Sequence, residues 1–283
     1  MQWRVGKVRI SKIVEFETVG LVGDLLPQAG NEEIRKLPWL IPLFATEDGR
    51  LKMSVHALVV ETQQHRIVVD TGIGNDKEGL GDPTWNNRKG SFLEDIKAAG
   101  FPPESIDTVI CTHLHVDHVG WNTRLRGGKW VPTFDNARYL FGRTEYEHWR
   151  NHSDTPAKRA VFKDSVQPIM EAGKATLIAS DARITDEISL IPTPGHSPGH
   201  VSVHIKSDGE EAVLIGDSAH HPCQMAHVDW STPYDTDPVQ AGATRRQLFS
   251  RFADTPTLLI GGHFDGGHLR RDGGGAFKFV AAA

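Results

Sequence analysis

A run of ligand-type side chains stands out first. Residues 113–118 contain three histidines and one aspartate, His113, His115, Asp117 and His118. In an extended chain, side chains two residues apart face the same way, so His113 and His115 can reach one metal ion together. Asp117 and His118 follow where the chain turns and can face a second ion. Imidazole and carboxylate are usual zinc ligands, and burying four of them without partners would be costly.

Three later segments each end an apolar stretch with another ligand-type residue. His196 lies in the turn Thr193-Pro194-Gly195-His196, Asp217 follows Val213-Leu214-Ile215-Gly216, and His263 follows Leu258-Leu259-Ile260-Gly261-Gly262. Sites in α/β proteins assemble at the ends of strands. A single Gly-His pair is more often structural, but four such segments in this order predict one metal site.

The elements that must position these residues alternate between strands and helices, which indicates an α/β protein. The helix over residues 91–99 should begin with Ser91 and Glu94 as a capping box and end at Gly100. The apolar pattern predicts strands near residues 4–18, 52–61, 66–70, 106–111, 176–178, 187–191, 200–206, 211–216, 257–260 and 276–280, and helices over 143–151, 156–171 and 238–252.

Together these segments resemble the metallo-β-lactamase superfamily, with its His-x-His-x-Asp-His motif, Thr-Pro-Gly-His turn, Gly-Asp strand end and late Gly-His. The resemblance implies a four-layered αββα sandwich with two metal ions, expected to be zinc, although manganese, iron or cobalt would suit the same ligands. It assigns His113, His115 and His196 to one ion, Asp117, His118 and His263 to the other, and Asp217 to both. Asp70 matches a position that supports a ligand through a hydrogen bond; the alternative is an aspartate that opens the turn before Gly72.

Within the superfamily, the chain looks most like the N-acyl-homoserine lactonase and methyl-parathion-hydrolase-like branch. True β-lactamases lack an aspartate like Asp217, and the short tail after His263 leaves no room for the helical domain of glyoxalase-II-like thioesterases. The resemblance implies hydrolysis of a lactone or related ester by a hydroxide that bridges the metals, with Asp117 handling its proton. Homoserine lactonases often carry a tyrosine three residues after the bridging aspartate. In this chain His220 occupies that position. It could act as an acid or a hydrogen-bond donor, or it could be merely a solvated side chain.

Two other activities remain open on the same residues. A bridging hydroxide could also attack a phosphotriester, and a single iron could support a sulfur-handling oxidoreductase. A binding module in which the metal ions only stabilise the fold is disfavoured, because structural zinc sites are usually rich in cysteine. Only Cys111 and Cys223 are present, and a catalytic role for Cys223 is not expected.

Composition sets the remaining expectations. The chain has 283 residues, 24% charged and 39% hydrophobic, with a net charge of −5. We expect a single domain over residues 1–283, in the cytoplasm, with a small-molecule substrate and no nucleic-acid or membrane partner. The apolar residues among 20–50 either pack onto the core or form a lip over a pocket, and they could also support a homodimer.

Overall fold

The structure is a computed structural model that describes residues 1–20 and 25–282. The chain divides into two compact units. The first unit comprises Met1–Glu15 and Val55–Ser180, and the second comprises Phe16–Ser54 and Asp181–Ala283. Each unit is described below by itself.

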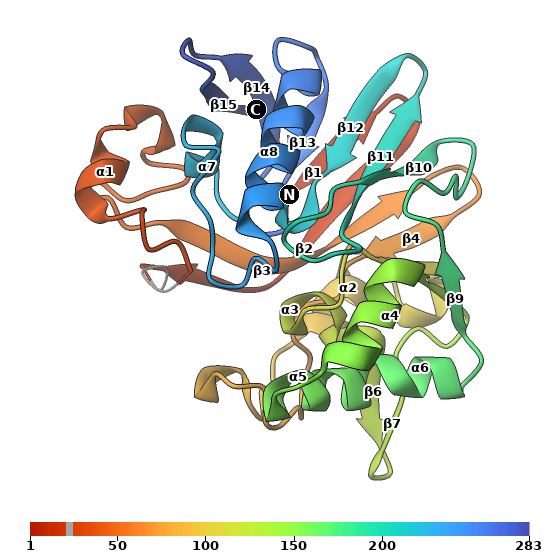
Figure 1. The fold of residues 1–283 in the computed structure, drawn as a ribbon. Coiled ribbons are helices and arrows are strands. Elements are labelled where there is room, and N and C mark those ends of the chain that lie inside the picture. Colours follow the sequence, from red (N-terminus) through yellow and green to blue (C-terminus); the bar gives the residue numbers. More distant parts are fainter. Residues whose placement is uncertain (21–24, 283) are drawn as a thin grey trace. The chain divides into compact units, whose positions relative to one another are not determined.

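A seven-stranded sheet has the order β1-β2-β3-β4-β5-β8-β9, and Figure 1 labels β1 to β4 and β9 of it. Its strands are β1 (Gln2–Val5), β2 (Val8–Val19), β3 (Lys52–Glu61), β4 (Arg66–Val69), β5 (Thr108–Cys111), β8 (Arg138–Gly142) and β9 (Ala175–Ile178). From β4 onward the neighbouring strands run parallel. Parallel strands are covered on both faces, which accounts for the fully buried, apolar sequence of β5.

The helices of the first unit follow the strands of this sheet. They are α2 (Phe92–Ala98), α3 (Val116–Val119), α4 (Arg143–His152), α5 (Pro156–Val161) and α6 (Gln167–Glu171), with a π-helical turn over Phe162–Val166 and short 3₁₀ turns at Pro83–Trp85, Pro103–Ser105 and Gly120–Asn122. Thr155 caps α5 by accepting a hydrogen bond from the Lys158 backbone, with Pro156 at the first helical position. A small hairpin of β6 (Thr123–Arg126) and β7 (Lys129–Pro132) completes the unit.

The second unit is built on a six-stranded sheet in the sequential order β10 to β15. Its strands are β10 (Ile188–Pro192), β11 (Val201–Ser207), β12 (Glu210–Leu214), β13 (Leu258–Ile260), β14 (Gly267–Arg271) and β15 (Phe277–Ala281). Its helices are α1 (Asn31–Arg35), α7 (Cys223–Ala226) and α8 (Pro238–Phe252), with 3₁₀ turns at Pro38–Leu40 and Gly216–Ser218. Asp237 caps the long helix α8 through the Gln240 backbone, and α8 buries Leu248, Phe249 and Phe252 in the core of this unit.

Part of the apolar stretch among residues 20–50 belongs to that same core. Leu26, Ile34, Leu40 and Phe44 are all buried there. Residues 21–24 of the stretch, with Leu21, lie outside the described residues. The described part therefore packs onto the core, and its role as a lip over a pocket stays a prediction.

Most expected elements are present, with three differences. Ser91 stands at the N-cap of α2 as expected, but its hydroxyl donates to Asp95 and makes no capping hydrogen bond, so the capping box with Glu94 is wrong. The helix expected over 156–171 is broken by the π-helical turn, just before Pro168, whose ring nitrogen cannot donate to the ladder. The strands β6, β7, β8 and β14 and the short helices α1, α3 and α7, whose bounds are given above, were not anticipated.

None of the helices in the described ranges, 1–20 and 25–282, is long and apolar enough to span a bilayer.

Candidate metal centre

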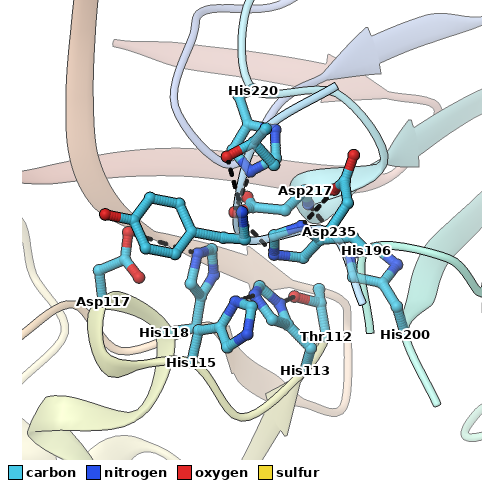
Figure 2. A network of polar contacts seen from close by, with 12 residues as sticks. Thr112, His113, His115, Asp117, His118, His196, His200, Asp217, His220 and Asp235 are labelled. Carbon is cyan, nitrogen blue, oxygen red and sulfur yellow. Dashed lines mark hydrogen bonds and ion pairs between the residues drawn. The ribbon is translucent and has the colours of Figure 1, made fainter. Parts of the chain in front are cut away.

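The first unit gathers four of the expected ligands directly after β5. The His113 Nε2 and His115 Nδ1 atoms lie 3.0 Å apart, and the His118 Nε2 and Asp117 Oδ2 atoms lie 3.7 Å apart. Two donors bound to one tetrahedral zinc at about 2.0–2.1 Å are about 3.3 Å from each other. Each of these two donor pairs in the first unit therefore has a spacing that suits binding to one ion; Figure 2 draws the four side chains.

Asp70 holds this loop from the neighbouring strand. It follows β4, which pairs in parallel with β5, so its carboxylate meets the residues that follow β5. Its oxygens accept from the Thr112 backbone N–H and hydroxyl, both at 2.8 Å, and from His118 Nδ1 at 2.9 Å. With Nδ1 protonated toward Asp70, His118 presents the lone pair of Nε2, as a metal ligand must.

Helix α4 adds a second support for the loop, which the sequence analysis missed. Glu145 is buried and accepts from the Leu114 backbone N–H at 3.1 Å, between the two histidines of the loop. It also accepts from Trp149 Nε1 at 2.6 Å, and the Trp149 ring meets the His115 ring edge-on, 5.1 Å between centroids. In the sequence, the only sign of this support was a glutamate four residues before a tryptophan within a predicted helix, a spacing that makes the two side chains neighbours. Their position against the ligand loop follows only from the fold.

Glu15 braces the other side of the loop and was also missed. Its carboxylate accepts from the backbone of Ile73 and Gly74 and from Trp121 Nε1, at 2.7–3.0 Å. Burial raises the pKa of Glu15, and these three donors oppose that rise by stabilising the charged form. Trp121 follows His118 by three residues, so Glu15 ties the end of the ligand loop to the turn after Asp70.

The second unit gathers the other three expected ligands around one carboxylate oxygen. His196 Nε2 and His263 Nε2 lie 3.6 Å and 3.3 Å from Asp217 Oδ2. Strands β12 and β13 are parallel with Leu214 beside Ile260, and Asp217 and His263 each follow three residues later. The parallel register therefore brings Asp217 and His263 together, and these spacings also match donors that share an ion.

The histidines of the second unit are fixed through their second nitrogens. His196 Nδ1 lies 2.9 Å from Asp235 Oδ1, and His263 Nδ1 lies 3.1 Å from the Ser54 carbonyl oxygen. Burial raises the pKa of Asp235, while His220 and the buried Arg245 lower it. The Asp217 backbone N–H donates to His200 Nε2 at 3.0 Å, so His200 positions the aspartate and was not anticipated in that role.

His220 lies within the same group in the second unit. Its Nε2 is 3.2 Å from Asp217 Oδ2, and its ring is edge-on to His196 with 4.7 Å between centroids (Figure 2). His196, Asp217 and His220 are close enough to hold one ion. His220 Nδ1 is buried and, among the described residues, has no hydrogen-bond partner. His220 thus differs from His196 and His263, whose second nitrogens are fixed.

The neighbouring His221 has a structural role. It is fully buried, its Nε2 donates to the Phe44 carbonyl oxygen at 2.8 Å, and its Nδ1 accepts from the Cys223 backbone. Burial lowers the pKa of His221 to about 4, so the ring is neutral near pH 7. Cys111 and Cys223 are free and buried, and burial raises the pKa of both thiols, which suits neither a nucleophile nor a ligand.

Comparison with known protein families shows to which superfamily the chain belongs. A model of the metallo-beta-lactamase superfamily matches residues 50–263, most of the chain. The chain belongs to the metallo-beta-lactamase superfamily. The match runs from the start of β3 to His263 and so includes every expected ligand, and the predicted α/β metallo-β-lactamase fold is confirmed.

Individual relatives in the superfamily include lactonases. An N-acyl homoserine lactonase from Bacillus thuringiensis is 27% identical over 176 residues, which cover 58% of this chain and 63% of the relative. One from Bacillus cereus is 28% identical over 183 residues, covering 60% and 65%. The chain therefore spans just under two-thirds of the length of the curated relatives it matches.

Solved structures match over nearly the whole chain. A structure described as hydrolase AbOPH in the beta-lactamase superfamily aligns with a TM-score of 0.81 at 25% identity, covering 100% of this chain and 97% of that one. AidC, described as a dizinc quorum-quenching lactonase, aligns with a TM-score of 0.78 at 22% identity, again covering 100% and 97%. At that identity, the likeness to AidC speaks for the fold alone.

Proposed function

We propose that the protein is a dinuclear metallohydrolase that opens a lactone or a related carboxylic ester. In this proposal His113, His115 and His196 hold one ion, Asp117, His118 and His263 hold the second, and Asp217 binds both. The observation that carries it is the set of donor spacings within each unit, 3.0 to 3.7 Å, in a chain whose family match includes all seven residues.

The chemistry of the donor set fits divalent metal ions. Five imidazoles and two carboxylates are the ligands of catalytic rather than structural zinc sites. His118, His196 and His263 have Nδ1 beside an acceptor, which leaves Nε2 of each to bind. When bound, such ions supply Lewis acidity toward an ester carbonyl and a water acidic enough to react near neutral pH.

The chain's own residues would divide the remaining work. Asp117 Oδ2 lies beside His118 Nε2, and we assign Asp117 both a ligand role and the task of orienting or receiving the proton of the attacking water. Asp70, Asp235 and Glu145 hold the imidazoles or their loop in place. His220 is proposed to contact the substrate, because its buried Nδ1 has no other partner among the described residues.

Choosing a lactone over other substrates rests on the relatives named N-acyl homoserine lactonase. The choice is tested by measuring rates on an acyl-homoserine lactone, an aryl ester and an aryl phosphotriester with the same preparation. We expect the lactone or ester to be turned over fastest, with activity lost on chelation and restored by zinc. Faster phosphotriester turnover would make the organophosphate alternative the main activity. Full activity of the metal-stripped protein, or of His113→Ala, would overturn the proposal.

His220→Gln separates substrate contact from metal binding. If His220 contacts the substrate, the variant keeps its metal content while kcat/KM for the lactone falls. If His220 is instead a third donor beside His196 and Asp217, the variant loses metal affinity, and its role as a substrate contact is rejected. His227→Gln, a half-buried histidine stacked on Trp230, serves as the control.

A further inference from the structure

Two histidines outside the metal centre share one face of α4. His148 and His152 are four residues apart, the spacing that makes side chains neighbours on a helix. Their rings stack with 4.6 Å between centroids and 13° between planes. His152 is exposed and His148 is half-buried, so an ion from solution can reach the pair.

A hydrogen bond fixes which nitrogen of His152 can bind a metal ion, and burial favours the neutral form of His148. His152 Nδ1 lies 2.9 Å from the His148 carbonyl oxygen, which can only accept, so Nδ1 carries the proton. In the neutral ring the lone pair is then on Nε2. Burial lowers the pKa of His148 below its usual 6.5, helped by His152 and Lys158 and opposed by Asp154, and this favours the neutral form of the His148 ring.

Charged groups lie near the histidines. Asp154 and Lys158 pair with each other at 2.9 Å, so the Lys158 ammonium has a counter-ion. The Arg159 guanidinium donates to the carbonyl oxygens of Ser153 and Asp154. The remaining neighbour is Trp149, whose ring is edge-on to His148 with 5.2 Å between centroids. A divalent ion would therefore meet two imidazoles beside the Asp154–Lys158 ion pair.

We propose that His148 and His152 form a separate surface site for a divalent transition-metal ion. Two imidazoles suit Cu²⁺, Ni²⁺ and Zn²⁺, with Cu²⁺ bound most tightly. Trp149 contacts His148 on one side and His115 on the other, so an ion on the surface pair lies one aromatic ring from a proposed ligand. Protein exposed to excess zinc would then carry one ion more than the metal centre accounts for.

Copper titration of the protein as purified, with its resident metal counted before and after, tests the site. We expect one added Cu²⁺ per chain, with an electron paramagnetic resonance spectrum of nitrogen ligation and quenching of tryptophan fluorescence. His148→Gln or His152→Gln should weaken this binding by at least about 10-fold, the lower end of the cost of disturbing even an indirect metal partner. His65→Gln, an exposed imidazole beside Asp107 in the same unit, should leave it unchanged.

Two results would contradict the proposed surface site. One is copper uptake that is the same in His152→Gln as in the unsubstituted chain. The other is copper uptake matched by release of resident metal, which would place the copper in the metal centre. Both are independent of lactone hydrolysis, so failure of the proposed activity would not be mistaken for failure of the surface site.

Discussion

The orientation of single imidazoles is what turns histidines into metal ligands in this chain. His118, His196 and His263 each have Nδ1 beside an acceptor, namely Asp70, Asp235 and the Ser54 carbonyl. An imidazole held in this way loses little rotational freedom on binding an ion, and its tautomer is already correct. The affinity of the centre should therefore depend on residues that never touch the metal.

Asp70→Asn tests this dependence. The amide can still accept from the Thr112 backbone, but its NH₂ group cannot accept from the Thr112 hydroxyl and His118 Nδ1 as the carboxylate does. We expect metal affinity to fall by about 10- to 100-fold, measured by competition with a chromophoric chelator. Asp254→Asn is the control, because Asp70 and Asp254 both adopt left-handed backbone, with φ of 57° and 62°. Equal affinity in the two variants would show that Asp70 only opens the turn.

Glu145 allows a sharper comparison. Glu145→Gln retains an oxygen that can accept from Leu114 and Trp149, whereas Glu145→Leu leaves both donors buried without an acceptor. The leucine variant should lose about 1–3 kcal/mol of unfolding free energy and bind metal more weakly, and the glutamine variant should recover most of the metal affinity. Glu147→Leu, exposed on the same helix, should behave like the unsubstituted chain. If leucine and glutamine at position 145 bind metal equally well, Glu145 does not position the loop.

Pairs of neighbouring strands determine which ligands meet. In each unit two parallel strands end side by side, β4 with β5 and β12 with β13. The residues after those ends are Asp70 with Thr112 and Asp217 with His263. The second pair also needs a close approach of backbone, since a Cβ on Gly262 would lie 2.5 Å from Asp217 Oδ1.

Gly262→Ala should therefore damage the centre without removing a ligand. The added methyl group has to push the Asp217 carboxylate, which we propose binds both ions. We expect the variant to bind less metal per chain, measured by elemental analysis after gel filtration. Gly30→Ala, where a Cβ meets nothing within 4 Å, should keep the normal content. Unchanged metal content in Gly262→Ala would mean that Asp217 can shift without losing an ion.

A buried lysine ties the loop after β4 to the π-helical turn. Lys77 Nζ donates to Thr123 Oγ1 at 2.6 Å and to the Asp164 carbonyl at 3.1 Å, and it lies over the Trp130 ring. Burial lowers the pKa of Lys77 from 10.5 to about 7, against the opposing charges of Asp164 and Asp76. Between those two pH values the unfolded chain binds a proton that the folded chain does not, so stability should rise with pH.

Lys77→Met should remove that pH dependence. In the unsubstituted chain the contribution amounts to at most about 1.4 kcal/mol of unfolding free energy per pH unit. Urea unfolding at pH 7.5 and pH 9.5 measures the difference, with the exposed Lys163→Met as control. The same change of stability with pH in both variants would show that Lys77 keeps its ordinary pKa.

Much of this element-scale arrangement is predictable from the sequence, for physical reasons. The strands β5, β12 and β13 each end in buried apolar residues, and a proposed ligand follows each of them within three residues. The hairpin β6–β7 was not predicted because its strands are short and contain charged residues. Its Gly127-Gly128 turn is nevertheless a sequence signal for a hairpin. The sequence analysis did not identify the roles of Glu145, Glu15 and His200, because these roles depend on contacts between residues far apart in the sequence.

At the scale of the whole molecule, the proposed ligands extend along most of the chain. They run from His113 to His263, and the family match includes all seven of them. His113, His115, Asp117 and His118 belong to the first unit, and His196, Asp217 and His263 belong to the second. The number of ions bound per chain therefore tests the proposal as a whole.

The most direct test is the metal-to-protein ratio of the His148→Gln chain, in which the proposed surface site is removed. After zinc reconstitution and gel filtration, we predict two zinc ions per chain. His113→Ala, from the first unit, and His263→Ala, from the second, should each lower that number. A single iron per chain, or a ratio below one in a preparation that still hydrolyses lactones at full rate, would contradict the dinuclear centre.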